Sequence, residues 1–130
     1  MFKKNYTTAA TWYLKAAEQG HLVAQSRLGV IYGEGYGVPK NYEISIKWYT
    51  RAALQGDAEG QYNVGKGYYE GWLVEKNYVQ AYVWYSLSAA QGNPKARLHM
   101  NLLEPRLSPE ELAQAKDLAT KFKPQKEPPK

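Results

Sequence analysis

Few residues in this sequence have the type and spacing that catalysis or metal binding requires. The chain contains two histidines, His21 and His99, and no cysteine. Without cysteine it has no thiol nucleophile, no thiolate metal site and no disulfide framework. A metal or catalytic pair would need the two histidines to converge. The sequence has a 36-residue repeat, described below, and the two histidines occupy unrelated positions in it. We therefore interpret His21 as a helix cap and His99 as a solvated surface residue.

The other candidate groups also have structural explanations. Glu110 and Glu111 are adjacent, so they diverge on a helix, where charge in the first turn favours the helix dipole. The glycine-rich loop at 35–37 lacks the following Lys-Ser/Thr and the preceding strand of a phosphate-binding loop. No serine has a histidine placed by sequence to activate it. These observations favour a non-enzymatic protein with no cofactor and no metal.

The dominant pattern is a repeat with a period of 36 residues. Residues 41–56, NYEISIKWYTRAALQG, align without a gap on 5–20, NYTTAATWYLKAAEQG, and on 77–92, NYVQAYVWYSLSAAQG. All three segments share an Asn-Tyr start, a Trp-Tyr pair, an alanine and a closing Gln-Gly. A fixed period in the thirties is typical of solenoid proteins, in which each repeat packs on its neighbours.

Each repeat predicts two helices, which we name A and B. Asparagine can cap an A helix and glycine, which accepts a positive φ, can end it. These residues are Asn5, Asn41 and Asn77 at the starts and Gly20, Gly56 and Gly92 at the ends. One face of each A helix is aromatic and small, and it predicts the core. In the first repeat this face consists of Ala9, Trp12, Tyr13, Ala16 and Ala17.

The B helix follows directly, with His21, Asp57 and Asn93 in the capping position. Gly29 and Gly65 occupy the same place within it, where glycine costs about 1 kcal/mol relative to alanine. Recurrence of that cost predicts a close crossing with a neighbouring A helix.

The third repeat leads into a different C-terminal segment. Pro105 ends its B helix, and Ser108 with Glu111 predicts a capping box for a further helix. An apolar stripe through residues 112–122 indicates a terminal capping helix. The predicted organisation is one domain, 1–122, with repeats 5–40, 41–76 and 77–106 and a capping helix at 108–122. Residues 123–130, KPQKEPPK, are rich in proline and lysine and predict a disordered tail.

Charge does not favour a nucleic-acid or membrane-surface binder. The formal net charge is +5, but residues 119–130 hold four lysines against Glu127 and so account for +3. The remaining +2 is spread over a body with both signs interspersed. No apolar run approaches a membrane span or a signal-peptide core, so no membrane insertion is expected. The sequence does not decide between the cytoplasm and the periplasm.

The segment from Trp12 to Gly56 resembles the Sel-1-like repeat (SLR) family, relatives of the tetratricopeptide repeats. The resemblance covers residues 5–104 and rests on the aromatic pair, Ala-Ala, Gln-Gly, Leu-Gly and Gly-x-Gly-Val. It implies a right-handed α/α solenoid of three helical hairpins that serves as a scaffold or adaptor for a protein or peptide partner, most often in bacteria. A cysteine-rich subgroup is linked to β-lactam binding and hydrolysis. This chain departs from that subgroup at every cysteine, which argues against the activity.

We expect the partner to bind on the outer arc of the A helices, a concave strip in a solenoid. Two cations one turn apart suit an acidic group, and an aromatic side chain supplies an anchor. An apolar row on the third A helix, with Val79 at its start, either packs under the capping helix or binds the partner. The predicted site residues are Lys15, Lys47, Arg51, Tyr82, Val83 and Leu87. No helix is predicted before Asn5, so the first hairpin exposes a side that could support self-association.

Overall fold

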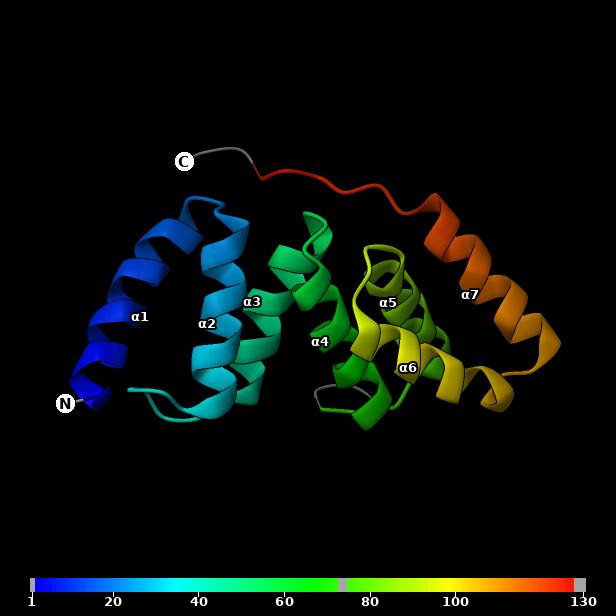
Figure 1. Ribbon diagram of the computed structural model, residues 1–130, viewed down its shortest axis with the longest axis horizontal. Helices are drawn as coiled ribbons and strands as arrows, with labels where there is room; N and C mark the ends of the chain where they lie inside the picture. The colour runs from blue at the N-terminus through cyan, green and yellow to red at the C-terminus, as the bar shows by residue number, and fades with distance from the viewer. Residues whose placement is uncertain (1, 73–74, 128–130) are drawn as a thin grey trace.

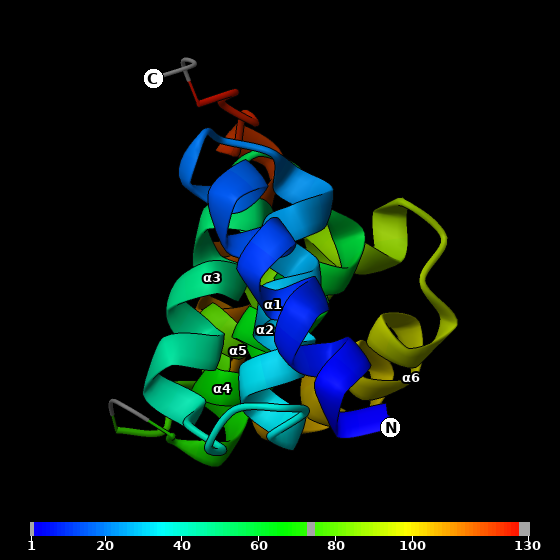
Figure 2. The same cartoon turned by 90° about the vertical axis from the view of Figure 1, so that its left-hand side faces the viewer.

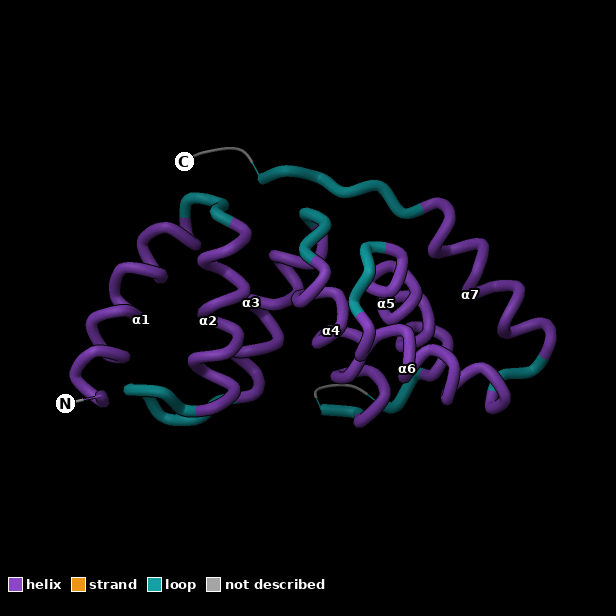
Figure 3. Tube along the Cα trace, viewed as in Figure 1, coloured by secondary structure: helices purple, strands orange, loops and turns teal. Residues whose placement is uncertain are grey.

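The computed structural model describes residues 2–72 and 75–127. In that part of the chain all regular structure is helical (Figure 3). The seven α-helices are α1 (Phe2–Glu18), α2 (Leu22–Glu34), α3 (Tyr42–Leu54), α4 (Ala58–Glu70), α5 (Tyr78–Ala90), α6 (Pro94–Leu103) and α7 (Pro109–Lys121), and a short 3-10 helix spans Glu104–Arg106. The prediction of an all-α solenoid is confirmed.

The helices form three consecutive hairpins, α1–α2, α3–α4 and α5–α6 (Figure 1). From α1 to α6 each helix packs on the next along the chain, and α7 packs against α5. Viewed from the end of the row, the hairpins lie one behind another (Figure 2). The A helices of the three hairpins are α1, α3 and α5, and the B helices are α2, α4 and α6.

Most of the predicted helix boundaries coincide with observed caps. The side chains of Asn41 and Asn77 accept hydrogen bonds from backbone amides one turn into α3 and α5. Three glycines after the A helices, Gly20, Gly56 and Gly92, have φ values of 93°, 103° and 96°. A residue with a Cβ rarely adopts this conformation, which explains why glycine recurs there.

Two predicted caps are wrong. Asn5 lies inside α1, which begins at Phe2, because Phe2-Lys3-Lys4 contains no residue that would stop the helix. His21 does occupy the N-cap position of α2, but its side chain makes no capping hydrogen bond. Imidazole is not among the strong N-cap groups, whereas Asp57 and Asn93 cap the two later B helices as predicted.

The mid-helix glycines mark close crossings, as predicted. A Cβ at Gly29 of α2 would lie 2.6 Å from the ring of Tyr49 on α3. A Cβ at Gly65 of α4 would lie 2.9 Å from the ring of Tyr85 on α5. The aromatic ring of each following A helix therefore packs directly on the backbone of the preceding B helix.

The tryptophans of the repeat differ in burial. Trp48 on α3 is buried in a cluster with residues of the first hairpin, including Leu28 and Ile31. Trp12 on α1, predicted to be in the core, is 66% exposed. The reason is that this position packs against the preceding hairpin, and none covers it in the described chain.

The C-terminal part of the chain contains the predicted capping helix, followed by an extended segment that was not predicted. Ser108 and Glu111 form the reciprocal capping box at the start of α7. Residues 123–127, expected to be disordered, instead run in an extended path back across the tops of the hairpins (Figure 1). Backbone and side-chain hydrogen bonds to α3 hold this segment in place. The rest of the predicted tail, 128–130, lies outside the described residues.

A candidate partner-binding site along the A helices

A small apolar groove opens between α3 and α5, with α4 as its floor. We call it the A-side groove; its volume is about 160 Å³. Its lining residues are Ile46, Thr50, Val64, Gly67, Tyr68, Trp72 and Trp84. Aliphatic and aromatic side chains predominate in it. The hydroxyl of Thr50 donates a hydrogen bond to the backbone carbonyl oxygen of Ile46.

Glycine at position 67 allows the walls of this groove to come together. A Cβ there would lie 3.0 Å from Cδ1 of Ile46 and 3.5 Å from the ring of Trp72. Trp72 is fixed on its other side by stacking on Tyr42, with ring centroids 5.1 Å apart. The groove is therefore lined by side chains held in place by neighbours from three elements.

Two of the predicted cations directly follow lining residues of this groove in the sequence of α3. Lys47 is exposed and follows Ile46, whereas Arg51 follows Thr50 and is half-buried. The Arg51 guanidinium lies 4.8 Å from the centroid of the Trp48 ring. Its Nη2 and Nε also donate to the two carboxylate oxygens of Glu127, at 2.7 and 3.1 Å. The hydrogen bond to Glu127 raises the pKa of Arg51 above its ordinary value.

The third predicted cation, Lys15, is exposed on α1. Its Nζ lies 5.9 Å from the centroid of the exposed Trp12 ring. Lys15 and Arg51 occupy the same position in successive repeats, 36 residues apart.

The remaining predicted site residues are covered by the capping helix. Tyr82 and Val83 are only 3% and 6% exposed and share a core cluster with Ala115 of α7. Leu87 is half-buried and packs against the same cluster. The apolar row of α5 therefore packs under α7, one of the two arrangements that the sequence allowed. These three side chains cannot form a partner surface while α7 is in place.

A second site, which is polar, lies at the turns between the A and B helices. We call this side of the molecule the turn edge. Gln55 at the end of α3 donates to the carbonyl oxygen of Gly20 at 3.0 Å and to Oε1 of Gln25 at 2.9 Å. Gln25, which is fully buried, donates to the carbonyl oxygen of Ala17 at 3.0 Å and to Glu127 at 3.2 Å. These amides join the first two hairpins and also bind the C-terminal segment.

Sequence reasoning did not assign a role to Gln25, Gln55 or Glu127. The available signal was periodicity, because glutamine recurs at 55 and 91 and again at 25 and 61. A polar residue that recurs at a helix end predicts a structural hydrogen bond. The contact with Glu127 had no such signal, since the C-terminal segment is not part of the repeat.

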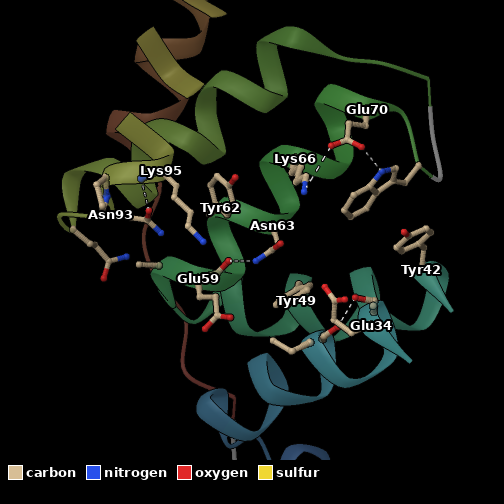
Figure 4. Close-up of a pocket in the computed structure, with 18 of the residues that line it drawn as sticks. Glu34, Tyr42, Tyr49, Glu59, Tyr62, Asn63, Lys66, Glu70, Asn93 and Lys95 are labelled. Carbon is tan, nitrogen blue, oxygen red and sulfur yellow. Dashed lines mark hydrogen bonds and ion pairs between the residues drawn. The ribbon is translucent and has the colours of Figure 1, made fainter. Parts of the chain in front are cut away.

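A wider groove, the B-side groove, lies between α2, α4 and the turn before α6 (Figure 4), and it shares Trp72 with the A-side groove. Its volume is about 840 Å³ and its lining mixes carboxylates, lysines and aromatic rings, among them Glu34, Lys66 and Tyr62. Ser45, which also lines it, donates its hydroxyl to the carbonyl oxygen of Gly29 at 2.6 Å. That serine is engaged in holding α2 against α3 and is not poised as a nucleophile.

The two histidines also occupy structural positions. His21 is exposed in the first turn, whereas His99 on α6 is half-buried, and its ring stacks on Tyr85 with centroids 5.4 Å apart. The expectation of a solvated His99 is therefore wrong, because the ring fills space beside Tyr85 and Tyr62. No group of three potential metal ligands occurs among the described residues.

Comparison with known proteins identifies the repeat. The model of the Sel1 repeat matches residues 2–21, 22–57 and 58–93. The chain belongs to the Sel1 repeat family. The two complete matches are 36 residues long and begin at the B helix, so the period agrees with ours and only the phase differs. A search of curated proteins gave no match.

Two solved structures with this repeat resemble the chain. One is c5321, a protective antigen of uropathogenic Escherichia coli with an SLR fold, at 32% identity and a TM-score of 0.87. The comparison covers 94% of this chain and 26% of the antigen, so the chain spans about a quarter of its length. The other is a Sel1 repeat protein from Oxalobacter formigenes, at 43% identity and a TM-score of 0.67 over 70% of this chain and 68% of that one. Both similarities support the Sel1 solenoid, whose members generally mediate protein–protein interactions.

Within the described part of the Sel1 chain, no helix is long and apolar enough to cross a bilayer.

Proposed function

We propose that this Sel1 protein is a non-catalytic scaffold that binds a segment of a partner protein on its A-helix side. The observation that carries the proposal is the A-side groove, an apolar cleft near which α3 carries the exposed Lys47 and, one turn further on, Arg51 in its ion pair with Glu127. An apolar cleft bordered by cations suits a segment with an apolar anchor and an acidic neighbour. The B-side groove is larger but mixed in polarity, so it offers less apolar area to an anchor.

Other classes of function have less support. A β-lactam hydrolase of the cysteine-rich kind would need features that this cysteine-free chain lacks, and Ser45 is held by a backbone carbonyl. A nucleic-acid binder would concentrate its cations on one face. Here Lys47, Lys66 and Lys116 lie on different helices among acidic side chains.

A capture experiment tests the proposal. The immobilised full chain is exposed to a lysate, bound proteins are quantified by mass spectrometry, and the wild type is compared with Thr50→Arg. The larger side chain fills the A-side groove, so proteins that depend on this groove should fall at least about tenfold, the effect of losing a buried apolar anchor.

Thr120→Arg is the matched control. Thr120 is exposed on α7 and bonds its hydroxyl to the carbonyl oxygen four residues back, as Thr50 does. Its substitution should leave capture unchanged. Equal capture by wild type, Thr50→Arg and Thr120→Arg would exclude the A-side groove as the partner site.

Two solution measurements separate the other classes. Turnover of a chromogenic β-lactam would favour the enzyme. Binding to DNA that weakens steeply with salt would favour the nucleic-acid binder, because phosphate contacts release counterions. We expect neither.

A further inference from the structure

The described C-terminal segment follows the turn edge as an extended ligand would. It leaves α7 at Phe122, whose ring lies edge-on to Trp84 of α5 with centroids 5.6 Å apart. The backbone amide of Gln125 then donates to the carbonyl oxygen of Leu54 at 2.9 Å. The segment finally places the carboxylate of Glu127 on Arg51.

The path of this segment is in register with the repeats. A Cβ at Gly56 would meet Pro124 at 3.2 Å, and a Cβ at Gly20, one repeat earlier, would meet Glu127 at 3.1 Å. The segment thus advances by three residues for each repeat of 36. Three extended residues span about 10 Å. The extended segment therefore meets equivalent glycines of two successive turns with residues three positions apart.

Each junction between hairpins presents the same amide groups to such a segment. At the first junction Gln55 and Gln25 are linked by a hydrogen bond, and Oε1 of Gln55 also accepts from the amide of Glu127 at 3.4 Å. At the second junction Gln91 donates to Gln61 at 3.0 Å and to the carbonyl oxygen of Gly56 at 2.7 Å. The glutamine pair is thus a repeated backbone-binding element, and at the first junction it is in use.

The residue five positions before the glycine of each A–B turn sets the charge at the junction. It is Lys15 in the first repeat, Arg51 in the second and Leu87 in the third. Arg51 binds Glu127 with two hydrogen bonds. A ligand that continues in the same register would place its residue three positions after that acid near Lys15. An acidic residue at that position of a ligand would therefore meet a cation.

We infer that the turn edge is a binding track for an extended protein segment with two acidic residues three positions apart, read by Arg51 and then Lys15. The chain's own C-terminal segment occupies this track in cis and competes with the partner. The inference rests on the proposed function, since it names the chemistry of a partner segment. It concerns the turn edge, however, and not the A-side groove.

The test uses the full chain and two labelled synthetic peptides. One has the sequence of residues 122–130, FKPQKEPPK, and the other, FKPQKEPPE, has glutamate in place of the last lysine. Binding is measured by fluorescence anisotropy to the wild type and to Glu127→Lys, which removes the cis carboxylate from the C-terminal segment. Circular dichroism confirms that each variant retains its helices.

The peptides should bind Glu127→Lys at least about tenfold more tightly than the wild type, because a tethered competitor acts at a high effective concentration. FKPQKEPPE should bind more tightly than FKPQKEPPK, and adding Lys15→Gln should remove that difference. Adding Arg51→Gln should weaken both peptides by about tenfold or more, as expected for losing a bidentate ion pair. Lys116→Gln, at an exposed position of α7, should have no effect.

Absence of peptide binding to Glu127→Lys, or unchanged binding after Arg51→Gln, would overturn the inference. Equal binding of the two peptides would overturn the role of Lys15. These results are independent of the capture experiment with Thr50→Arg. If no peptide binds the turn edge, the proposal for the A-side groove is unaffected. If Thr50→Arg does not reduce capture, the interpretation of the peptide measurements is unaffected.

Discussion

The ring of Tyr85 on α5 lies against the backbone of α4 at Gly65. A Cβ added at Gly65 would approach Cδ1 of Tyr85 to 2.9 Å and the carbonyl oxygen of Ala81 to 3.2 Å. Tyr85 is 1% exposed, so its ring has no open space into which to move. The second and third hairpins are therefore held at a separation that only glycine allows.

Gly65→Leu should destabilise the protein by about 1–3 kcal/mol, the usual cost of overpacking. We expect this destabilisation even though leucine is favoured over glycine by almost 1 kcal/mol in helix propensity. Chemical denaturation monitored by circular dichroism measures it. Lys66→Leu, at the next residue of the same helix and half-buried, is the control and should be nearly neutral. A Gly65→Leu protein as stable as the wild type would contradict the close crossing.

Trp48→Ala should lower the free energy of unfolding by about 3–5 kcal/mol. Trp48 is 7% exposed and joins the first hairpin to the second, so its removal leaves a cavity at that junction. Trp12→Ala changes the same residue of the repeat at a position that is 66% exposed, and it should cost far less. Thermal melts of the two variants compare the positions directly, and equal losses would be inconsistent with the observed burial.

The repeated part of the fold was predictable because each signal occurs more than once. Gly29 and Gly65 are costly inside a helix, and their common position indicated a close crossing that the structure confirms. Asn41 and Asn77 marked helix starts in the same way. Asn5 carried the same signal, but the residues before it continue the helix, so local sequence prevailed over the repeat.

The site was less predictable because it depends on parts of the chain outside the repeat. Arg51 and Lys47 could be placed on α3 from spacing alone, whereas the burial of Tyr82 and Val83 depends on where α7 packs. The position of Glu127 depends on the path of a proline-rich segment that composition alone describes as disordered. Periodicity cannot report on contacts made by a segment that occurs once.

Trp12 leads to a prediction about self-association. Its exposed ring lies on the side of α1 that, in the later hairpins, packs against a preceding hairpin. Leu14, also on α1, is 37% exposed. Because exposed apolar surface of this kind favours association, sedimentation velocity over a concentration series should show reversible dimers of the wild type. Trp12→Glu should remain monomeric at the same concentrations, and a wild type that is monomeric throughout would refute the prediction.

The buried Tyr85 phenol should also make the fold less stable at alkaline pH. Burial raises the pKa of the Tyr85 phenol above its ordinary value, with smaller contributions from Tyr62 and Glu70. In the unfolded chain the phenol titrates near its usual pKa of about 10. Above that pH the unfolded state binds fewer protons than the folded state, so the free energy of unfolding falls as pH rises.

Tyr85→Phe should therefore flatten the loss of stability above about pH 10. The Tyr85 hydroxyl is buried and has no hydrogen-bond partner among the described residues. Its removal should leave stability at pH 7 unchanged or raise it by about 1 kcal/mol, since no partner loses a hydrogen bond. Some alkaline dependence should persist, because burial raises the pKa of Tyr49 in the same way. Urea denaturation at pH 7 and at several pH values above 9 measures both effects, with Tyr36→Phe at an exposed ring as the control. A marked loss of stability at pH 7 in Tyr85→Phe would show instead that the hydroxyl makes a stabilising hydrogen bond.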